Sequence, residues 1–198
     1  MKKIVLIIIG IILVAVLIIG CINFTKPADN TNSDSNKSIP AEEKADYVGE
    51  QTTIIHKDFK TIIKTDWQEF EIQPQTFIYL PPNTAQDDIN AEVISIIMTY
   101  LGPNNQLTLN NILEQGVENS KTIIPDFELT ENSDNSQLDM PGKKIKFTGT
   151  QNNIKRNNAQ VFGIKNNTLY TITYSCPVGN CNSYSIFNTI INTFETNP

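Results

Sequence analysis

The sequence is poor in the residues that build many catalytic and metal sites. Among 198 residues there is one histidine, His56, and there are three cysteines. A single histidine excludes a multi-histidine metal centre and leaves one possible base for a Ser-His-Asp or Cys-His arrangement. His56 lies in a plain strand-like stretch, and we interpret it as structural. Because no Gly-rich phosphate loop, nucleophile elbow or His-Glu-x-x-His motif occurs, we expect no catalytic residue, no cofactor site and no metal site.

Positive charge is also scarce. The chain has 15 Lys and Arg residues against 21 Asp and Glu residues, and its formal net charge is -6. Lys2 and Lys3 precede the N-terminal apolar run, so the chain beyond that run is more acidic still. Binding to nucleic-acid phosphates needs a concentrated basic face, and nucleic acid is therefore not an expected partner.

The strongest positive signal is the apolar N-terminus, residues 1–24, in which residues 4–22 carry no charge. As a helix this run would span roughly 28 Å, close to the ~30 Å hydrocarbon core of a bilayer, which favours a transmembrane anchor. The order Ile18-Ile19-Gly20-Cys21, however, resembles a bacterial lipobox in which Cys21 would be lipidated. Both alternatives place Lys2 and Lys3 in the cytoplasm and export the rest of the chain.

The remaining chain divides into a tether and one domain. Residues 25–47 are rich in Asn, Ser, Asp, Lys and Pro and have no hydrophobic period, so we expect a disordered linker. Residues 48–198 have the usual size of a single globular domain. The localisation predicted by this order is the cell membrane, single-pass or lipid-anchored, with the domain on the extracytoplasmic side.

Two cysteines of the domain agree with export. Cys176 and Cys181 bracket Pro-Val-Gly-Asn, a turn sequence that can bring the two chain ends together. In an oxidising compartment the natural interpretation is a local disulfide. Free thiols, a redox pair and a metal site are alternatives. The spacing is not Cys-x-x-Cys, and two thiols alone fall short of a tetrahedral zinc site.

Strand patterns dominate the domain, and two segments also predict which way side chains face or where a hairpin turns. Residues 143–150 place Ile145 and Phe147 on one face and Lys144 and Lys146 on the other, while Asn166-Asn167 suits a tight hairpin turn. Residues 93–101 form a continuous apolar run that favours a buried strand, with a helix as the alternative. The other expected strands are residues 52–63 (one or two strands), 67–72, 76–80, 127–130, 159–164 and 169–175.

Helical spacing marks two further segments. Residues 109–120 have one apolar face, and Thr108 is placed to accept the free amides of the first turn. A second amphipathic helix is expected near the C-terminus, started by Asn182 or Ser183, with apolar residues at Tyr184, Phe187, Ile190, Ile191 and Phe194. Strands joined by hairpins and flanked by helices predict an α+β fold with an antiparallel sheet.

These segments, taken in order, resemble PsbP-like domains, the superfamily of the photosystem II extrinsic protein. That superfamily also includes membrane-anchored proteins of non-photosynthetic prokaryotes. The resemblance implies an α-β-α sandwich and a non-enzymatic accessory or binding role outside the membrane, but it does not carry photosystem function. It rests on Tyr79-Leu80-Pro81-Pro82-Asn83, Leu107-Thr108-Leu109-Asn110-Asn111-Ile112, Met140-Pro141-Gly142-Lys143-Lys144-Ile145-Lys146-Phe147, Leu169-Tyr170-Thr171-Ile172-Thr173-Tyr174 and residues 186–194.

Two functions follow as hypotheses. The first is a membrane-anchored extracytoplasmic domain that scaffolds a membrane complex or binds a ligand; its partner would be an envelope protein or a small molecule. The alternative is an envelope-associated hydrolase that uses carboxylates, because paired carboxylates can meet in space without a sequence motif.

The sequence also contains two candidate sets of calcium ligands and three N-glycosylation acceptor patterns. Calcium could find oxygen ligands at Asp87, Asp88 and Glu92, or at Glu131, Asp134 and Asp139. Neither set has the spacing of a calcium loop, and we interpret both as solvated loop charge. N-glycosylation acceptor patterns begin at Asn23, Asn36 and Asn166, although such patterns also arise by chance in so Asn-rich a chain.

Overall fold

The computed structural model describes residues 50–103 and 105–197. The expected anchor with Cys21, the linker, and the acceptor patterns at Asn23 and Asn36 lie outside these residues. Neither of the helices in the described part of the chain has the length and apolar character needed to cross a membrane.

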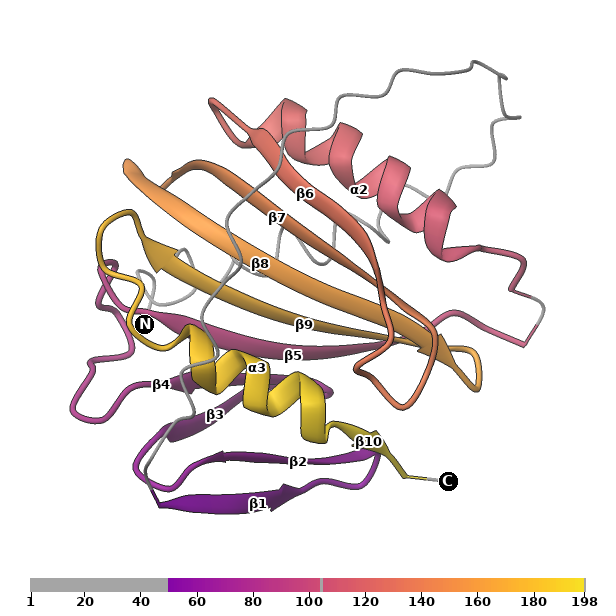
Figure 1. The fold of residues 1–198 in the computed structure, drawn as a ribbon, viewed down its shortest axis with the longest axis horizontal. Coiled ribbons are helices and arrows are strands. Elements are labelled where there is room, and N and C mark those ends of the chain that lie inside the picture. The colour runs from indigo at the N-terminus through magenta and orange to yellow at the C-terminus, as the bar shows by residue number, and fades with distance from the viewer. Residues whose placement is uncertain (1–49, 104, 198) are drawn as a thin grey trace.

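The centre of the domain is a seven-stranded sheet in which every neighbouring pair is antiparallel (Figure 1). The strand order is β3-β4-β5-β9-β8-β7-β6. The strands are β3 (Gln68–Gln73), β4 (Thr76–Leu80), β5 (Val93–Tyr100), β6 (Glu128–Asn135), β7 (Gly142–Gln151), β8 (Ile154–Lys165) and β9 (Thr168–Pro177). The apolar run at residues 93–101 is therefore a central strand, as its length and Val-Ile content favoured.

A smaller sheet, which the sequence did not predict as separate, contains β1 (Gln51–Ile55), β2 (Phe59–Lys64) and β10 (Glu195–Thr196), in the order β1-β2-β10. It forms because the end of the chain returns to β2. Phe59 and Phe194 stack with ring centroids 5.3 Å apart beside this pairing. A strand as short as β10 has no hydrophobic period of its own, so it could not be recognised from sequence.

The hairpin between β8 and β9 turns at the predicted dipeptide. Asn166 and Asn167 have φ angles of 51 and 58°, in the left-handed region that two-residue hairpins of type I′ require. Both residues are exposed. The acceptor pattern at Asn166 therefore lies at the tip of this hairpin.

The two described helices are α2 (Leu109–Ile123) and α3 (Tyr184–Thr193). Thr108 caps α2 as predicted: its hydroxyl accepts the Asn111 amide, while the Asn111 side chain accepts the Thr108 amide in return. Ser183 precedes α3 and makes no side-chain capping hydrogen bond. The packing of α3 onto the sheet, not its cap, stabilises it.

The helices lie on opposite faces of the large sheet. One cluster packs α2 against Ile145, Phe147 and Phe162, while another packs α3 against Val161 and Ile172. The predicted division of β7 is confirmed, because Lys144 and Lys146 lie on the α3 face. Within the described residues the fold is α+β, with two helices and antiparallel sheets.

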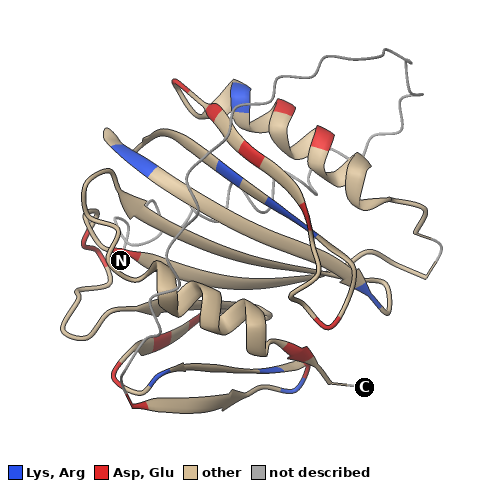
Figure 2. Ribbon diagram, viewed as in Figure 1, with Lys and Arg blue, Asp and Glu red and all other residues tan. Residues whose placement is uncertain are grey.

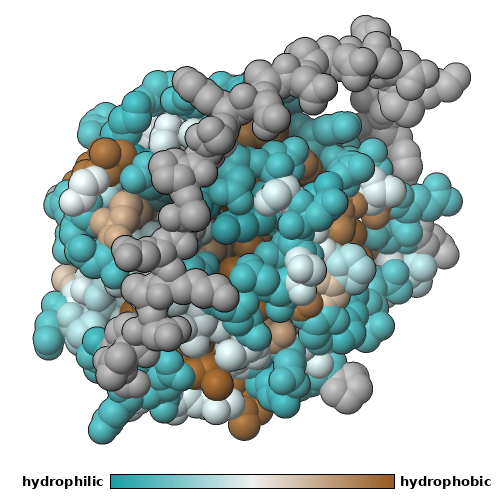
Figure 3. Space-filling view, viewed as in Figure 1, coloured by the Kyte–Doolittle hydropathy of each residue, from teal (hydrophilic) through white to brown (hydrophobic). Residues whose placement is uncertain are grey.

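The surface is largely polar. On β6 and β7, acidic residues of one strand form ion pairs with lysines of the other because the two strands are adjacent. Figure 2 shows the lysines of β7 beside the acidic residues of β6. Glu131 pairs with both Lys144 and Lys146, at 3.7 and 3.2 Å, while Asp134 pairs with Lys143 at 2.6 Å. The visible face in the space-filling view is mostly hydrophilic, with scattered apolar residues (Figure 3).

Candidate functional site at the disulfide-bonded end of the sheet

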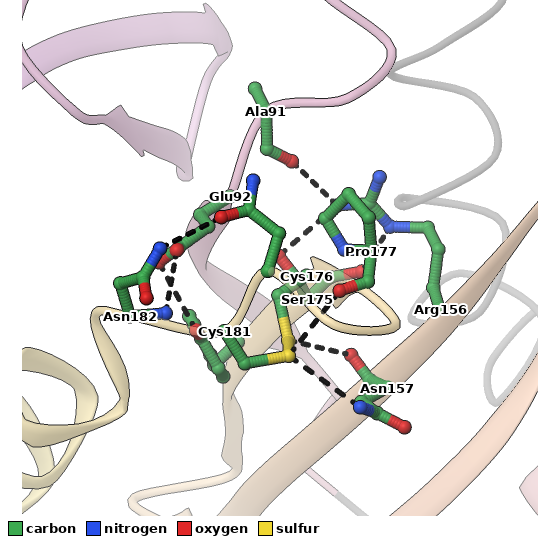
Figure 4. The surroundings of a disulfide bond; sticks show 11 residues. Ala91, Glu92, Arg156, Asn157, Ser175, Cys176, Pro177, Cys181 and Asn182 are labelled. Atoms are coloured by element: carbon green, nitrogen blue, oxygen red, sulfur yellow. Dashed lines mark hydrogen bonds between the residues drawn. A yellow bond between two sulfur atoms is a disulfide. The ribbon is translucent and has the colours of Figure 1, made fainter.

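Cys176 and Cys181 form the disulfide that their spacing predicted (Figure 4). Cys176 is fully buried at the end of β9, and Cys181 lies in the segment before α3. Gly179, between them, has a φ of 87°, a left-handed conformation that glycine adopts without strain. The bond therefore fastens the start of α3 to the end of the central strand.

Glu92 lies beside this disulfide with only 6% of its surface exposed. Its carboxylate accepts the backbone N–H of Asn182 at 2.7 Å and the hydroxyl of Tyr174 at 3.1 Å. Burial, followed by the charge of Glu92 and its hydrogen bond, raises the pKa of the Tyr174 hydroxyl, which thus stays a donor. Glu92 consequently joins the segment before β5 to the segment before α3.

Arg156, the chain's sole arginine, is the second buried charged residue here, with 5% exposure. It donates to the hydroxyl and the carbonyl of Ser175, at 2.8 and 3.1 Å. It also donates to the carbonyls of Ile89 at 2.9 Å and Ala91 at 2.7 Å. Burial lowers the pKa of Arg156, and the nearby Tyr174, Asp88 and Glu92 oppose that effect. Its planar fork of donors suits several carbonyls at once, which a lysine could not match.

This cluster orders two exposed loops at one end of the sheet. Arg156 holds the loop between β4 and β5 through the Ile89 carbonyl, and the Lys155 carbonyl accepts the backbone N–H of Val178 at 2.9 Å. Ile89 and Val178 are 41% and 52% exposed although both are apolar. We name this pair the loop-tip surface. Glu92 and Arg156 are hydrogen-bonded within the protein, so their chemical role in this arrangement is to position these loops.

Sequence reasoning did not find Arg156 or the role of Glu92. Glu92 was considered as a calcium ligand and interpreted as solvated loop charge, which is wrong because it is buried, and Arg156 was not singled out. The one available signal was that every other basic residue of this type is a lysine and the single arginine lies just before the strand expected at residues 159–164.

The structure does not bring the suggested calcium ligands together. Glu92 is hydrogen-bonded to Asn182 and Tyr174, whereas Asp88 accepts the backbone N–H of Asn90 at 2.9 Å. In the second set, Glu131 and Asp134 pair with β7 lysines, and Asp139 pairs with Lys165 at 2.7 Å. Within residues 50–103 and 105–197, no group of three or more His, Cys, Asp or Glu side chains is arranged to hold a metal ion.

His56 takes part in packing. Its ring lies 4.0 Å from the ring of Phe77 and 4.8 Å from that of Phe59, measured between centroids. Its Nε2 atom is 3.2 Å from the carboxylate of Glu69. These contacts join the small sheet to the edge of the large one.

No protein-family model matches the sequence, and no curated protein matches it either. Comparison with solved structures shows the fold. The cyanobacterial PsbP of Synechocystis sp. PCC 6803 matches with a TM-score of 0.57 and 11% identity, covering 79% of this chain and 98% of that one. The described domain therefore has a PsbP-like fold.

Two other solved structures share this arrangement. LpqN of Mycobacterium tuberculosis, described as involved in cell envelope biogenesis, matches with a TM-score of 0.54 and 13% identity over 77% of this chain and 94% of that one. The Ran-binding protein Mog1p of Saccharomyces cerevisiae matches with a TM-score of 0.51 and 8% identity, over 74% of this chain and 94% of that one. At such identities the likeness concerns the fold alone.

Proposed function

We propose that this chain is a membrane-anchored extracytoplasmic accessory domain that binds an envelope protein and scaffolds a membrane complex without catalysing a reaction. The observation that carries the proposal is the Cys176–Cys181 disulfide at the end of β9, the middle strand of a PsbP-like fold. Disulfides persist in oxidising compartments, and the apolar residues 4–22 supply a means of reaching and staying at one.

The buried charged residues support binding over catalysis. A general acid or base must reach a substrate proton, yet Glu92 is buried and hydrogen-bonded to Asn182 and Tyr174. Arg156 is likewise occupied by backbone carbonyls and Ser175. The hydrogen bonds of Glu92 and Arg156 offset the cost of burying the two charges, and they fix the geometry of the loops, which favours recognition of a partner.

The names of two structural neighbours bear on the proposal, one through the cell envelope and the other through binding. LpqN is described as involved in cell envelope biogenesis, and Mog1p as a Ran-binding protein. We extend to this chain the general idea that a PsbP-like fold can present a surface to a partner.

The loop-tip surface is the contact that we propose for the partner. Ile89 and Val178 expose apolar side chains. The Arg156 guanidinium donates to the Ile89 carbonyl, and the Val178 N–H donates to the Lys155 carbonyl, so β8 holds the backbone of both. A rigid apolar surface loses little conformational entropy on binding, which favours a specific contact.

Affinity purification of the tagged chain from cross-linked, solubilised membranes tests this proposal. The variant Ile89→Asp/Val178→Asp places charge on the loop-tip surface, and Ile55→Asp changes a residue of β1 that is 73% exposed. We expect one membrane protein to be recovered with the wild type and with Ile55→Asp, but not with the double variant. Equal recovery with all three, or recovery of no membrane protein, would contradict the proposal.

A further inference from the structure

The outer edge of β1 is the least protected strand edge in the described part of the chain. There, β1, β3, β6 and β10 lie at the borders of the two sheets, and Figure 1 shows β1 at the outer border of the small one. We infer that β1 is a self-association site, at which it pairs antiparallel with β1 of a second copy of this chain. The inference is independent of the partner proposed for the loop-tip surface, because that surface lies in other segments.

The other three border strands have features that oppose pairing with a further strand. β3 contains Glu69 and Glu71, and its pairing with β4 shifts register. β6 contains three acidic residues, and its pairing with β7 also shifts register. β10 has only two residues. Charge, irregular register and short length are means by which proteins protect sheet edges from association.

β1 has none of these features. Its five residues, Gln51 to Ile55, include no charged residue and no proline, and they pair with β2 in an unbroken register. All but Gln51 are β-branched, a property that favours strands. Ile55 is 73% exposed, the highest value among the exposed large hydrophobic side chains of the described residues. This edge therefore suits strand addition.

Hydrogen bonds at the two ends of the β1–β2 pair show which backbone groups face outward. The Glu50 carbonyl accepts the N–H of Thr65, and the Phe59 carbonyl accepts the N–H of His56. In an antiparallel pair, residues that bond to the neighbouring strand alternate with residues whose N–H and C=O groups point away from it. The residues of β1 that present their backbone groups outward are therefore Gln51, Thr53 and Ile55.

A contact on the other side of β2 agrees with this assignment. Ile62 lies opposite Thr53 in the β1–β2 register, and its N–H donates to Thr193 Oγ1 at 3.0 Å. Because Ile62 directs its N–H away from β1, the Thr53–Ile62 pair is one of the pairs without mutual hydrogen bonds. Both backbone groups of Thr53 consequently face the outer edge.

A two-fold pairing centred on Thr53 matches all three outward-facing residues. Thr53 then lies opposite Thr53 of the second copy, and Gln51 lies opposite Ile55. Each of these residues donates one backbone hydrogen bond to the second copy and accepts one from it. The side chains also fit, because opposed threonines stabilise a strand pair and the Gln51 methylene groups cover part of Ile55.

The charges near β1 favour a second copy as the occupant. In the two-fold register Glu50 lies opposite His56, so no like charges oppose each other at the ends of the strand. Pairing β3 with itself about Phe70 would instead place Glu69 opposite Glu71, and like charges at opposed positions destabilise a strand pair. β1 has no charge of its own that would select an acidic or a basic segment of another protein.

Disulfide cross-linking of the full-length chain in mild detergent tests the predicted register. Opposed residues of a hydrogen-bonded antiparallel pair have Cα atoms about 5.5 Å apart, which a disulfide can bridge. After oxidation at high protein concentration, we expect Thr53→Cys to give a dimer on a non-reducing gel. Gln51→Cys and Ile55→Cys should each give only the background of the parent chain, whereas a mixture of these two variants should cross-link.

A charge series at Thr53 tests whether the strand pair holds the dimer together. Thr53→Lys and Thr53→Glu each place like charges opposite one another, whereas a mixture of the two variants places opposite charges there. Thermal unfolding establishes that each variant is folded. By sedimentation equilibrium in the same detergent, we expect a dimer for the wild type, loss of the dimer for each variant alone, and its recovery in the mixture.

Three results would overturn the inference. The first is a monomeric wild type, or a dimer that Thr53→Lys and Thr53→Glu both retain. The second is cross-linking of Thr53→Cys no stronger than that of Gln51→Cys. The third comes from oxidising membranes of cells that express Thr53→Cys: a product that contains another protein in place of a second copy would assign this edge to that protein.

Discussion

Glu92 accepts the backbone N–H of Asn182 at 2.7 Å, although the two residues are 90 positions apart. The same carboxylate accepts the Tyr174 hydroxyl at 3.1 Å, and the disulfide closes immediately before Asn182. One buried side chain thus joins β5, β9 and the start of α3. The stability of this end of the domain therefore depends on a few non-local contacts.

Replacing Glu92 with alanine should lower the free energy of unfolding by about 1 to 3 kcal/mol, because it leaves the buried Tyr174 hydroxyl without an acceptor and removes the hydrogen bond to the Asn182 backbone. Tyr174→Phe removes only one of these hydrogen bonds and should cost about 1 kcal/mol. Urea unfolding of the full-length chain in mild detergent measures both. Equal stability of Glu92→Ala and the wild type would show that the Glu92 contacts contribute nothing.

Removal of the disulfide should also destabilise the domain. The double variant Cys176→Ala/Cys181→Ala releases a short loop, for which the chain-entropy model gives about 2 kcal/mol. Hydrogen exchange should accelerate most at residues 182–187, because the bond fastens the start of α3. Uniform acceleration across the sheet, or none near α3, would contradict this local role.

Two glycines should respond to alanine in opposite directions. Gly116→Ala should raise the free energy of unfolding by about 1 kcal/mol, because alanine has the higher helix propensity and Gly116 lines a small cavity between α2 and the large sheet. At Gly149 an added Cβ would overlap the side chain of Ile124, so Gly149→Ala should destabilise. Thermal unfolding of the two variants side by side provides the measurement. Loss of stability in Gly116→Ala would show that the space beside this glycine cannot take a methyl group.

Asp139 should make stability fall in acid. Its partial burial acts to raise its pKa, but the Lys165 ammonium and the N–H and O–H of Thr196 outweigh that effect and lower it. Because the folded pKa lies below the ordinary value of about 3.9, the stabilisation is present above that pH and is lost as pH falls through the folded pKa. Carboxyl NMR titration of Asp139 measures this pKa directly.

Asp139→Asn provides the matched test of the same linkage. The variant should be less stable than the wild type near neutral pH, and the difference should shrink in acid as the wild-type carboxylate becomes protonated. A difference that grows in acid would contradict the sign of the shift.

Local features of the fold could be predicted from sequence, and non-local ones could not. The Cys176–Cys181 bond and the Asn166-Asn167 hairpin each depend on neighbouring residues whose turn chemistry is visible in the chain. The cap at Thr108 is local in the same way. By contrast, Arg156 donates to the Ile89 carbonyl, 67 residues away in the chain. The hydrophobic periodicity of a sequence predicts helices and strands but not contacts between distant residues.

The same distinction applies to the candidate sites. Carboxylates near one another in sequence were considered together as calcium ligands. In the structure, β6 pairs with β7, and Glu131 and Asp134 form ion pairs with lysines of β7. Gln160 and Ser95 lie in one row across β8, β9 and β5, with Thr173 between them, although the two residues are distant in the chain. Such sites become visible only when the strand order is known.

The proposal depends above all on the side of the membrane that the domain occupies. Tyr100 is 60% exposed, and Tyr100→Cys introduces a surface thiol distinct from the Cys176–Cys181 pair. Spheroplasts can be treated with a membrane-impermeant maleimide before or after lysis, with the parent chain as the control for background labelling. An extracytoplasmic domain predicts equal labelling of Tyr100→Cys in intact and lysed spheroplasts. Labelling only after lysis would contradict the account.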